Sequence, residues 1–182
     1  MSIHTGVRDI PGFKYQIQVN NSQNYVIASK NNQIVVTSIN DSQATLYWYF
    51  LPLPSTGQFY IFLQDGDFNY DSTDGIVSSG NFINYNPQTP DAPVTLETYP
   101  GTTAFTWVTE TPLTGNAYNW GSAQGKSTTA CITTTNGGLL LPTAYKNDHN
   151  SNNPAGSVSV DHSKFIATTQ DFTQWLLSGS TN

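Results

Sequence analysis

The sequence predicts an all-β domain made of three related units, and three observations support this prediction. Of its 182 residues, 13% are aromatic and only 10% are charged, whereas roughly 25% are charged in an average domain. Short runs such as KYQIQVN (14–20) alternate polar and apolar residues between turn-forming residues, as half-buried strands do. A Trp also recurs in similar surroundings at Trp48, Trp107 and Trp175.

The strands expected in each repeat are short, β-branched or aromatic, and bounded by Asn, Asp, Gly, Ser or Pro. In chain order they are KYQIQVN (14–20), NYVIAS (24–29), QIVVTSI (33–39), QFYIFLQ (58–64), PVTLETY (93–99), SVSVDH (157–162) and KFIATT (164–169). The polar segment YKNDHNSNNPAG (145–156) predicts an exposed loop in the third repeat. No window shows the period of an amphipathic helix of about a dozen residues.

The repeats are defined by openers and closers that alternate along the chain. Gly-x-x-Tyr opens a segment at Gly12, Gly57 and Gly115, and each segment closes on one of the three Trp residues. The repeats cover residues 12–54, 57–112 and 115–178 of a single domain, 1–182. Three units of about four strands predict a β-trefoil, in which a six-stranded barrel is capped by three hairpins. A β-sandwich is the alternative, although a sandwich needs no threefold pattern.

The charge and hydropathy patterns exclude several classes of function. The net charge is −6, Arg8 is the single Arg, and the five Lys residues are scattered, so no basic stripe exists for nucleic acid or for an acidic membrane surface. No apolar run approaches the roughly 20 residues that span a bilayer. The N-terminal segment lacks the apolar core of a signal peptide, and Cys131 is the single Cys. These features favour a cytoplasmic protein, or one released without a signal peptide.

Motifs for catalysis and for nucleotides are not convincing. GSAQGKST (121–128) has three residues between its glycines, whereas a phosphate-binding loop needs four. The three His residues, His4, His149 and His162, lack metal-ligand spacing. No pair of carboxylates can be assigned to acid–base work from spacing alone. The sequence therefore predicts a protein that is not an enzyme and needs no cofactor.

One segment leaves calcium binding open. DGDFNYDSTDGI (65–76) places oxygen-bearing side chains at alternate positions, as an EF-hand loop does. Tyr70 stands where that loop needs Gly, and Ile76 stands where it needs Glu. The segment is therefore no EF-hand, and the looser alternative is a calcium site formed by Asp65, Asp67, Asn69 and Asp71.

With a Trp closing each repeat, the chain resembles the ricin-B-like (R-type) β-trefoil lectins of fungi. It resembles more loosely the fungal β-trefoil protease inhibitors. Repeats of the lectins often end in Gln-x-Trp, whose Trp packs in the core, so the resemblance implies a structural role for the three Trp residues. The chain departs from the motif at the Gln, where it has Leu46, Phe105 and Thr173.

The same resemblance implies a sugar site in the second repeat. Lectin sites of this type use an Asp early in the repeat, then an aromatic side chain and an Asn. Repeat one has Ile27 or Ala28 at the Asp position, and repeat three has GLLLPTA (138–144), without a carboxylate. The second repeat alone keeps the chemistry, and its candidate carbohydrate-binding residues are Asp71, Tyr85, Asn86 and Tyr99. The simpler interpretation of Asp71 is a turn-capping residue.

The expected function is that of a lectin without catalytic activity, which binds glycans or glycoproteins in a shallow loop pocket of the second repeat. Single contacts of this kind are weak, so a homo-oligomer would add avidity. The alternative is a protease inhibitor that presents residues 87–93 and 147–156 to a protease active site. A third possibility is a subunit whose trefoil binds another protein and nothing else.

Overall fold

The computed structural model describes residues 13–20, 22–53, 57–71, 76–89, 91–110, 127–162 and 175–181. The first repeat contains β1 (Phe13–Val19), β2 (Ser22–Lys30), β3 (Gln33–Ser38) and β4 (Trp48–Pro52). The second contains β5 (Phe59–Leu63), β6 (Asn69–Asp71), β7 (Ile76–Asn84), β8 (Thr95–Tyr99) and β9 (Trp107–Glu110). The third contains β10 (Ser127–Thr134), β11 (Leu139–Pro142), the short helix α1 (Thr143–Asn147), β12 (Gly156–Asp161) and β13 (Trp175–Thr181). The all-β class is thereby confirmed.

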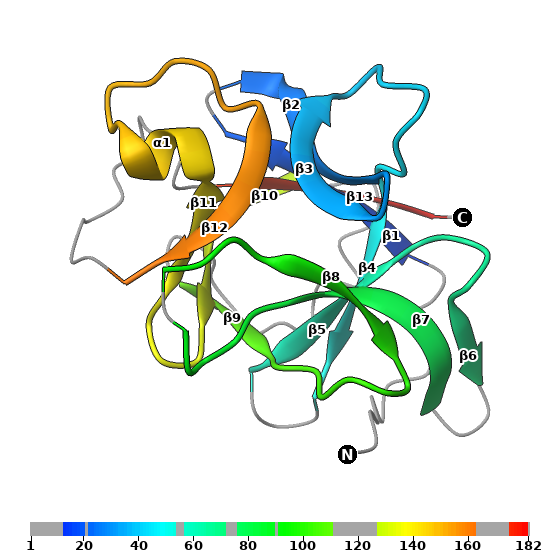
Figure 1. The fold of residues 1–182 in the computed structure, drawn as a ribbon. Helices are drawn as coiled ribbons and strands as arrows, with labels where there is room; N and C mark the ends of the chain where they lie inside the picture. Colours follow the sequence, from blue (N-terminus) through cyan, green and yellow to red (C-terminus); the bar gives the residue numbers. More distant parts are fainter. Residues whose placement is uncertain are drawn as a thin grey trace.

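The first and last strands of the three repeats close into a barrel. Strand β1 pairs with β4, β4 with β5, β5 with β9, β9 with β10, β10 with β13, and β13 returns to β1, all antiparallel. Closure leaves no unpaired strand edge in the ring. Six of the remaining strands form one hairpin per repeat, namely β2–β3, β7–β8 and β11–β12 (Figure 1).

The three hairpins meet at one end of the barrel. Strand β12 pairs with β3 through Gly156 and Ser157, and Ser159 forms a bridge with Pro93 just before β8. A six-stranded barrel capped by three hairpins is the predicted β-trefoil and not a sandwich. The second repeat adds β6, which pairs with the start of β7 and which the four-strand pattern did not predict.

The three closing Trp residues occupy equivalent places. The Nε1–H of Trp48 donates to the Ile27 carbonyl at 2.9 Å, that of Trp107 to Ile83 at 3.3 Å, and that of Trp175 to Leu140 at 3.1 Å. Each acceptor lies in the first strand of the hairpin of the same repeat, namely β2, β7 or β11. All three indole rings are fully buried. The structural role that the resemblance implied for these residues is therefore correct.

The equivalence that the sequence predicted between the Gly-x-x-Tyr openers, by contrast, is wrong by one residue. Tyr15, Phe59 and Ala130 lie opposite the Trp residues of their repeats, so Tyr15 is equivalent to Phe59 and not to Tyr60. Neighbouring strand residues face opposite sides, which puts Tyr15 in the barrel core and Tyr60 outside it. The third opener, residues 115–120, and the predicted strand 164–169 lie outside the described residues.

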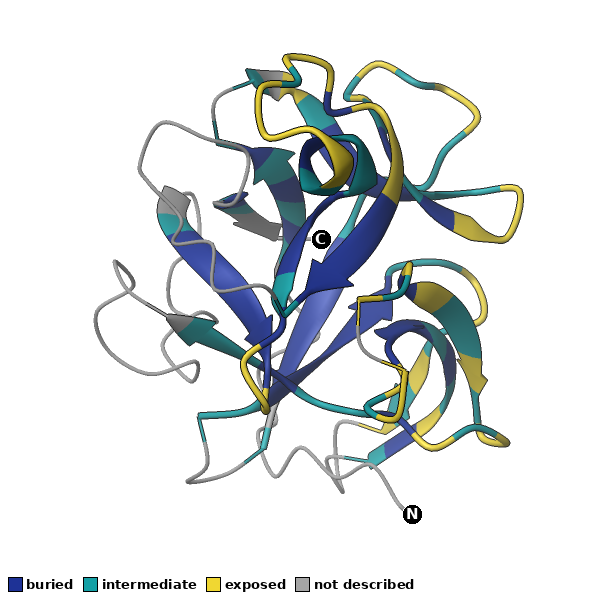
Figure 2. Cartoon of the chain, turned by 60° about the vertical axis from the view of Figure 1, so that its left-hand side comes forward, coloured by how far each residue is buried: buried dark blue, intermediate teal, exposed yellow. Residues whose placement is uncertain are grey.

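A second cluster, here called the outer aromatic cluster, packs outside the barrel under β7. Its buried members are Tyr49, Leu51, Tyr60, Phe62, Val77, Phe82 and Ala104. At Gly80 of β7, a Cβ would lie 2.9 Å from a ring carbon of Phe62, so this backbone can pass the rings only without a side chain. Figure 2 shows buried barrel strands and exposed residues concentrated in the turns that join the hairpin strands.

The expected loop at 145–156 is partly helical. Its first residue, Tyr145, lies in α1 and packs in the barrel core, whereas residues 147–150 are exposed as predicted. The segment begins as a helix because the Tyr145 side chain packs in the core, although the residues around it are polar. Within the described part of the chain, no helix has the length and apolar character needed to cross a membrane.

Candidate functional site

Strand β7 separates the residues that the sequence predicted would form one site. Asp71 is exposed and pairs with Ile76 at the beginning of β7, whereas Tyr85 follows the last residue of that strand. Nine residues of strand correspond to roughly 30 Å of chain. The structure therefore places Asp71 at the opposite end of β7 from Tyr85 and Asn86 and does not bring the three side chains together.

Tyr85 is mainly a structural residue. It is 9% exposed, its hydroxyl donates to the Thr106 carbonyl at 2.5 Å, and its ring meets Trp107 edge-on at a centroid distance of 4.7 Å. Burial raises the pKa of its phenol above the ordinary value. Its ring also packs on Phe105 at 5.6 Å, so Tyr85 supports a more exposed aromatic residue.

Tyr99 lies at the other end of β8. It pairs with Gly80 and packs against the outer aromatic cluster, and a cis peptide bond joins it to Pro100. It lines a separate small hollow of about 290 Å³ with residues 100–103. Of the four predicted residues, the structure brings together only Tyr85 and Asn86.

These two residues line a hollow of about 510 Å³, here called the repeat-two hollow. Its lining comes from the end of β7, the 86–93 loop, the start of β8 and the 102–105 segment. The side chains that supply its chemistry are those of Asn86, Thr89, Thr95, Glu97, Thr102 and Phe105.

The buried side-chain amide of Asn84 joins the end of β7, next to Tyr85, to the segment that carries Phe105. Asn84 donates from Nδ2 to the Thr103 carbonyl and accepts the Phe105 N–H at Oδ1, both at 3.0 Å. These two bonds join the end of β7 to the 103–105 segment, so Phe105 is fixed against Tyr85. Asn86 accepts the Gln88 N–H at 2.9 Å, which forms the turn that begins the loop.

The hollow combines a carboxylate, an amide, hydroxyl groups and a partly exposed aromatic ring. These groups can accept and donate hydrogen bonds to a polyhydroxylated ligand, and the ring offers an apolar face. Glu97 and Phe105, which line this hollow, were not among the candidate carbohydrate-binding residues that the sequence indicated. One signal was available, because Thr95 and Glu97 alternate with Val94 and Leu96 along a strand and therefore share one face.

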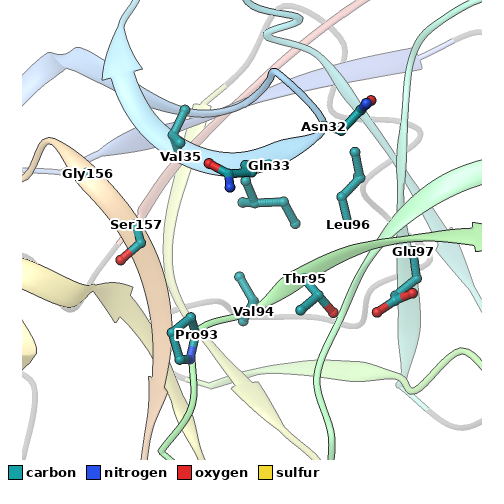
Figure 3. A pocket seen from close by; sticks show the side chains of 11 residues that line it. Asn32, Gln33, Val35, Pro93, Val94, Thr95, Leu96, Glu97, Gly156 and Ser157 are labelled. Carbon is teal, nitrogen blue, oxygen red and sulfur yellow. The ribbon is translucent and has the colours of Figure 1, made fainter.

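A second groove, of about 610 Å³, lies between β3, β8 and β12, where the three repeats meet. Figure 3 shows Val94 and Leu96 pointing towards β3, and Thr95 and Glu97 pointing the other way. Asn32 and Gln33 line the groove from the first repeat, and Ser157 from the third. The groove and the repeat-two hollow adjoin along β8 and share Pro93, Thr95 and Glu97 of their lining, whereas Val94 and Leu96 line only the groove.

In the described part of the calcium candidate segment, residues 65–71, Asp65 accepts hydrogen bonds from a near neighbour and from β7. Asp65 accepts the Asp67 N–H at 2.9 Å and the Asn81 Nδ2 at 3.3 Å. Across the described ranges, no group of three or more His, Cys, Asp or Glu side chains is placed to hold a metal ion. Of the GSAQGKST motif, Ser127 and Thr128 begin β10, and the preceding residues lie outside the described ranges.

Two solved structures are similar in fold. One is described under "Structure and mode of action of a mosquitocidal holotoxin", with a TM-score of 0.58 and 12% identity over 93% of this chain, which spans only 17% of that one. The other is a designed 3-fold symmetric protein, ThreeFoil, with a TM-score of 0.55, 12% identity, and coverage of 91% of this chain and 97% of that one. No protein-family model and no curated protein matches the sequence. At this identity the likenesses show the fold, and the threefold design agrees with the β-trefoil.

Proposed function

We propose that this β-trefoil is a carbohydrate-binding protein without catalytic activity, which binds a glycan in the repeat-two hollow. The observation that carries the proposal is the meeting of Glu97, Asn86 and Phe105 around one open cavity. Each supplies a different part of sugar recognition, namely a charged acceptor, an amide and an apolar surface. The proposal keeps the second repeat as the binding repeat and replaces Asp71 by Glu97 as the carboxylate.

The binding of a single sugar at this site is expected to be weak. The hollow is open and its polar groups are solvated before binding, so much of each new hydrogen bond replaces one to water. A dissociation constant on the order of 1 mM, equivalent to about −4 kcal/mol, is reasonable for such a site. Multivalent presentation is therefore the suitable format for detection.

The test is a glycan array probed with the wild-type protein and three variants. Glu97→Gln keeps the size of the side chain and removes its charge, and Phe105→Ala removes the apolar surface. Loss of a charge-assisted hydrogen bond weakens binding by about tenfold or more. Asp71→Asn is the matched control, because Asp71 lies at the far end of β7 and should leave binding unchanged.

Two outcomes would contradict the proposal. Wild-type protein without signal on any glycan would remove the proposed function. Glycan binding that is lost in Asp71→Asn and kept in Glu97→Gln would place the site at Asp71 instead.

A protease inhibitor is the second candidate, and the exposed loop after α1 favours it. The Asp148 carboxylate accepts the Asn150 N–H at 3.0 Å, the Asp148 carbonyl accepts the Ser151 N–H at 2.8 Å, and Asn153 accepts the Ala155 N–H at 3.1 Å. A loop held by its own hydrogen bonds loses little entropy when it enters a cleft. Titration of papain and trypsin tests this role, and equimolar inhibition without glycan binding would favour it over the first candidate.

A further inference from the structure

His162 joins the second and third repeats beside the repeat-two hollow. Its Nδ1 lies 3.5 Å from the Asp91 carboxylate, and its Nε2 lies 3.2 Å from Oδ1 of Asn136. The main-chain N–H of His162 also donates to Asp91 at 2.5 Å. Asp91 comes from the 86–93 loop of the second repeat, whereas His162 and Asn136 belong to the third.

The hydrogen bonds around Asn136 show which imidazole nitrogen carries a proton. Thr134 Oγ1 accepts the Gly138 N–H at 2.8 Å and donates to Asn136 Oδ1 at 2.5 Å. The Asn136 oxygen is therefore an acceptor, and the Nε2 of His162 must donate to it. A neutral imidazole has a single N–H, so Nδ1 can also donate to the carboxylate only when the ring is an imidazolium.

The position of the ring is restricted on both sides. A Cβ added to Gly138 would lie 2.6 Å from Cε1 of His162, so the ring packs directly on that backbone. Nδ1 is shielded from solvent and makes no hydrogen bond to the described residues. The Asp91 carboxylate at 3.5 Å is the group that would respond to a proton on Nδ1.

Asp91 needs the contacts that hold it. Its φ angle is +64°, a left-handed conformation that few residues other than Gly, Asn and Asp adopt. Its carbonyl accepts the Lys146 Nζ of α1 at 2.8 Å. The residues after it, Ala92 and Pro93, line the repeat-two hollow and are joined to β12 by the Val160 N–H and by the Pro93–Ser159 bridge. Asp91 is therefore the residue next to that wall at which a further contact to the third repeat can act.

The charged groups around the ring come from three elements of the described structure. The 86–93 loop supplies Asp91, α1 supplies Lys146 on the Asp91 carbonyl, and β12 supplies Asp161, the neighbour of His162 in the chain. The β10–β11 turn contributes Asn136 and no ionisable side chain. Asp161 is the last residue of β12 and is buried.

We propose that His162 and Asp91 form a protonation-dependent clamp, which adds a side-chain contact between the second and third repeats at Asp91. Main-chain bonds from Val160 N–H to the Ala92 carbonyl at 3.0 Å and from Val94 N–H to the Val158 carbonyl at 2.8 Å join the repeats beside it whatever the protonation state. When the imidazole gains its second proton, Nδ1–H donates to the Asp91 carboxylate in addition to the His162 main-chain N–H. When the ring is neutral, the Nδ1 contact is lost and the main-chain bond remains. The consequence, a firmer glycan site in acid, rests on the proposed function, whereas the clamp itself does not.

Hydrogen–deuterium exchange of the 86–94 segment tests the clamp without a glycan. Wild type, Asp91→Asn and the control His149→Gln are compared at about pH 5.5 and at about pH 8, on either side of the imidazole range. Variants are compared at the same pH, so the intrinsic pH dependence of exchange cancels. Asn tolerates the left-handed conformation and can still accept the His162 N–H, so Asp91→Asn removes the charge and keeps the fold.

We expect the segment to exchange about threefold faster in Asp91→Asn than in wild type at the lower pH, the size of effect that a partly exposed ion pair allows. At the higher pH the two proteins should exchange alike. His162→Gln should reproduce this pattern, and His149→Gln, two residues after α1, should match wild type. Equal exchange at both pH values, or a difference that does not depend on pH, would overturn the clamp. Loss of glycan binding with this pattern intact would overturn only the proposed function.

Discussion

Replacing Trp48 by Phe removes one of the three equivalent hydrogen bonds between a closing Trp and the first hairpin strand of its repeat. The indole is fully buried and donates to the Ile27 carbonyl at 2.9 Å. Phe keeps an aromatic ring in the core but lacks the N–H and part of the volume. The substitution therefore tests whether this bond and the packing of the indole stabilise the fold.

The expected loss of stability has two parts. Removing a buried hydrogen bond costs about 1 kcal/mol. Shrinking a core side chain by part of a ring costs roughly 1–2 kcal/mol, since deletion of a whole Trp or Phe side chain costs 3–5 kcal/mol. The sum is about 2–3 kcal/mol, equivalent to a fall in Tm of roughly 4–12 °C for a domain of this size. Trp107→Phe should lose less, because its hydrogen bond is longer, at 3.3 Å.

Urea unfolding followed by far-UV circular dichroism measures this loss. The midpoint should fall while the dependence of the unfolding free energy on urea stays constant, because a change of midpoint alone reports stability. A loss below about 0.5 kcal/mol, the range of ordinary surface substitutions, would refute the reasoning. A larger loss in Trp107→Phe than in Trp48→Phe would refute the ranking by hydrogen-bond length.

Two further substitutions test packing and charge. Gly80→Ala places a methyl group 2.9 Å from a ring carbon of Phe62 and should cost about 1–3 kcal/mol by overpacking; an unchanged Tm would show that the outer aromatic cluster yields easily. Hydrogen bonds from Lys30, the Gln43 N–H and Thr37 hold the pKa of Asp41 at about 2. Because this pKa is lowered in the folded state, the stabilisation is complete above the unfolded value near 4 and is lost as pH falls to about 2. Asp41→Asn should remove this pH dependence of the unfolding midpoint, and an unaltered profile would contradict the assignment.

The fold was predictable because the residues that stand out in the sequence, the three closing Trp residues, also form equivalent parts of the barrel core. A buried Trp is conspicuous in a sequence, and Trp48, Trp107 and Trp175 mark the same place in each repeat. The Gly-x-x-Tyr openers were less reliable, since Tyr15 and Tyr60 are aligned by sequence yet face opposite sides of the barrel wall. Both faces of β5 are buried, so its hydrophobic pattern gives no alternation from which to read the register.

The grouping of Asp71 with Tyr85 and Asn86 was not predictable from spacing, and β6 explains why. Ile27, Ile83 and Leu140 are equivalent, because each accepts the bond from its own Trp. The equivalent of Ile27 in the second repeat is therefore Ile83, and Asp71 belongs to the added strand before it. Counting along the chain aligned Asp71 with a position that Ile83 occupies in the structure. Glu97 was not a carbohydrate-binding candidate in the sequence because Asn86 and Phe105, which line the same hollow, lie near it only in the folded chain.

The pairing of β1 with β13 has a consequence for the order of folding. The Trp bonds connect residues 21, 24 and 35 positions apart, so each repeat can begin to organise from nearby residues. The barrel seam instead joins Phe13 to Thr181 and Val19 to Trp175, which lie almost a full chain apart. Contacts between such distant residues form slowly, because the loop entropy is lost before the contact is gained. The seam should therefore close last, and until then β1 keeps one unpaired edge while the chain is being made.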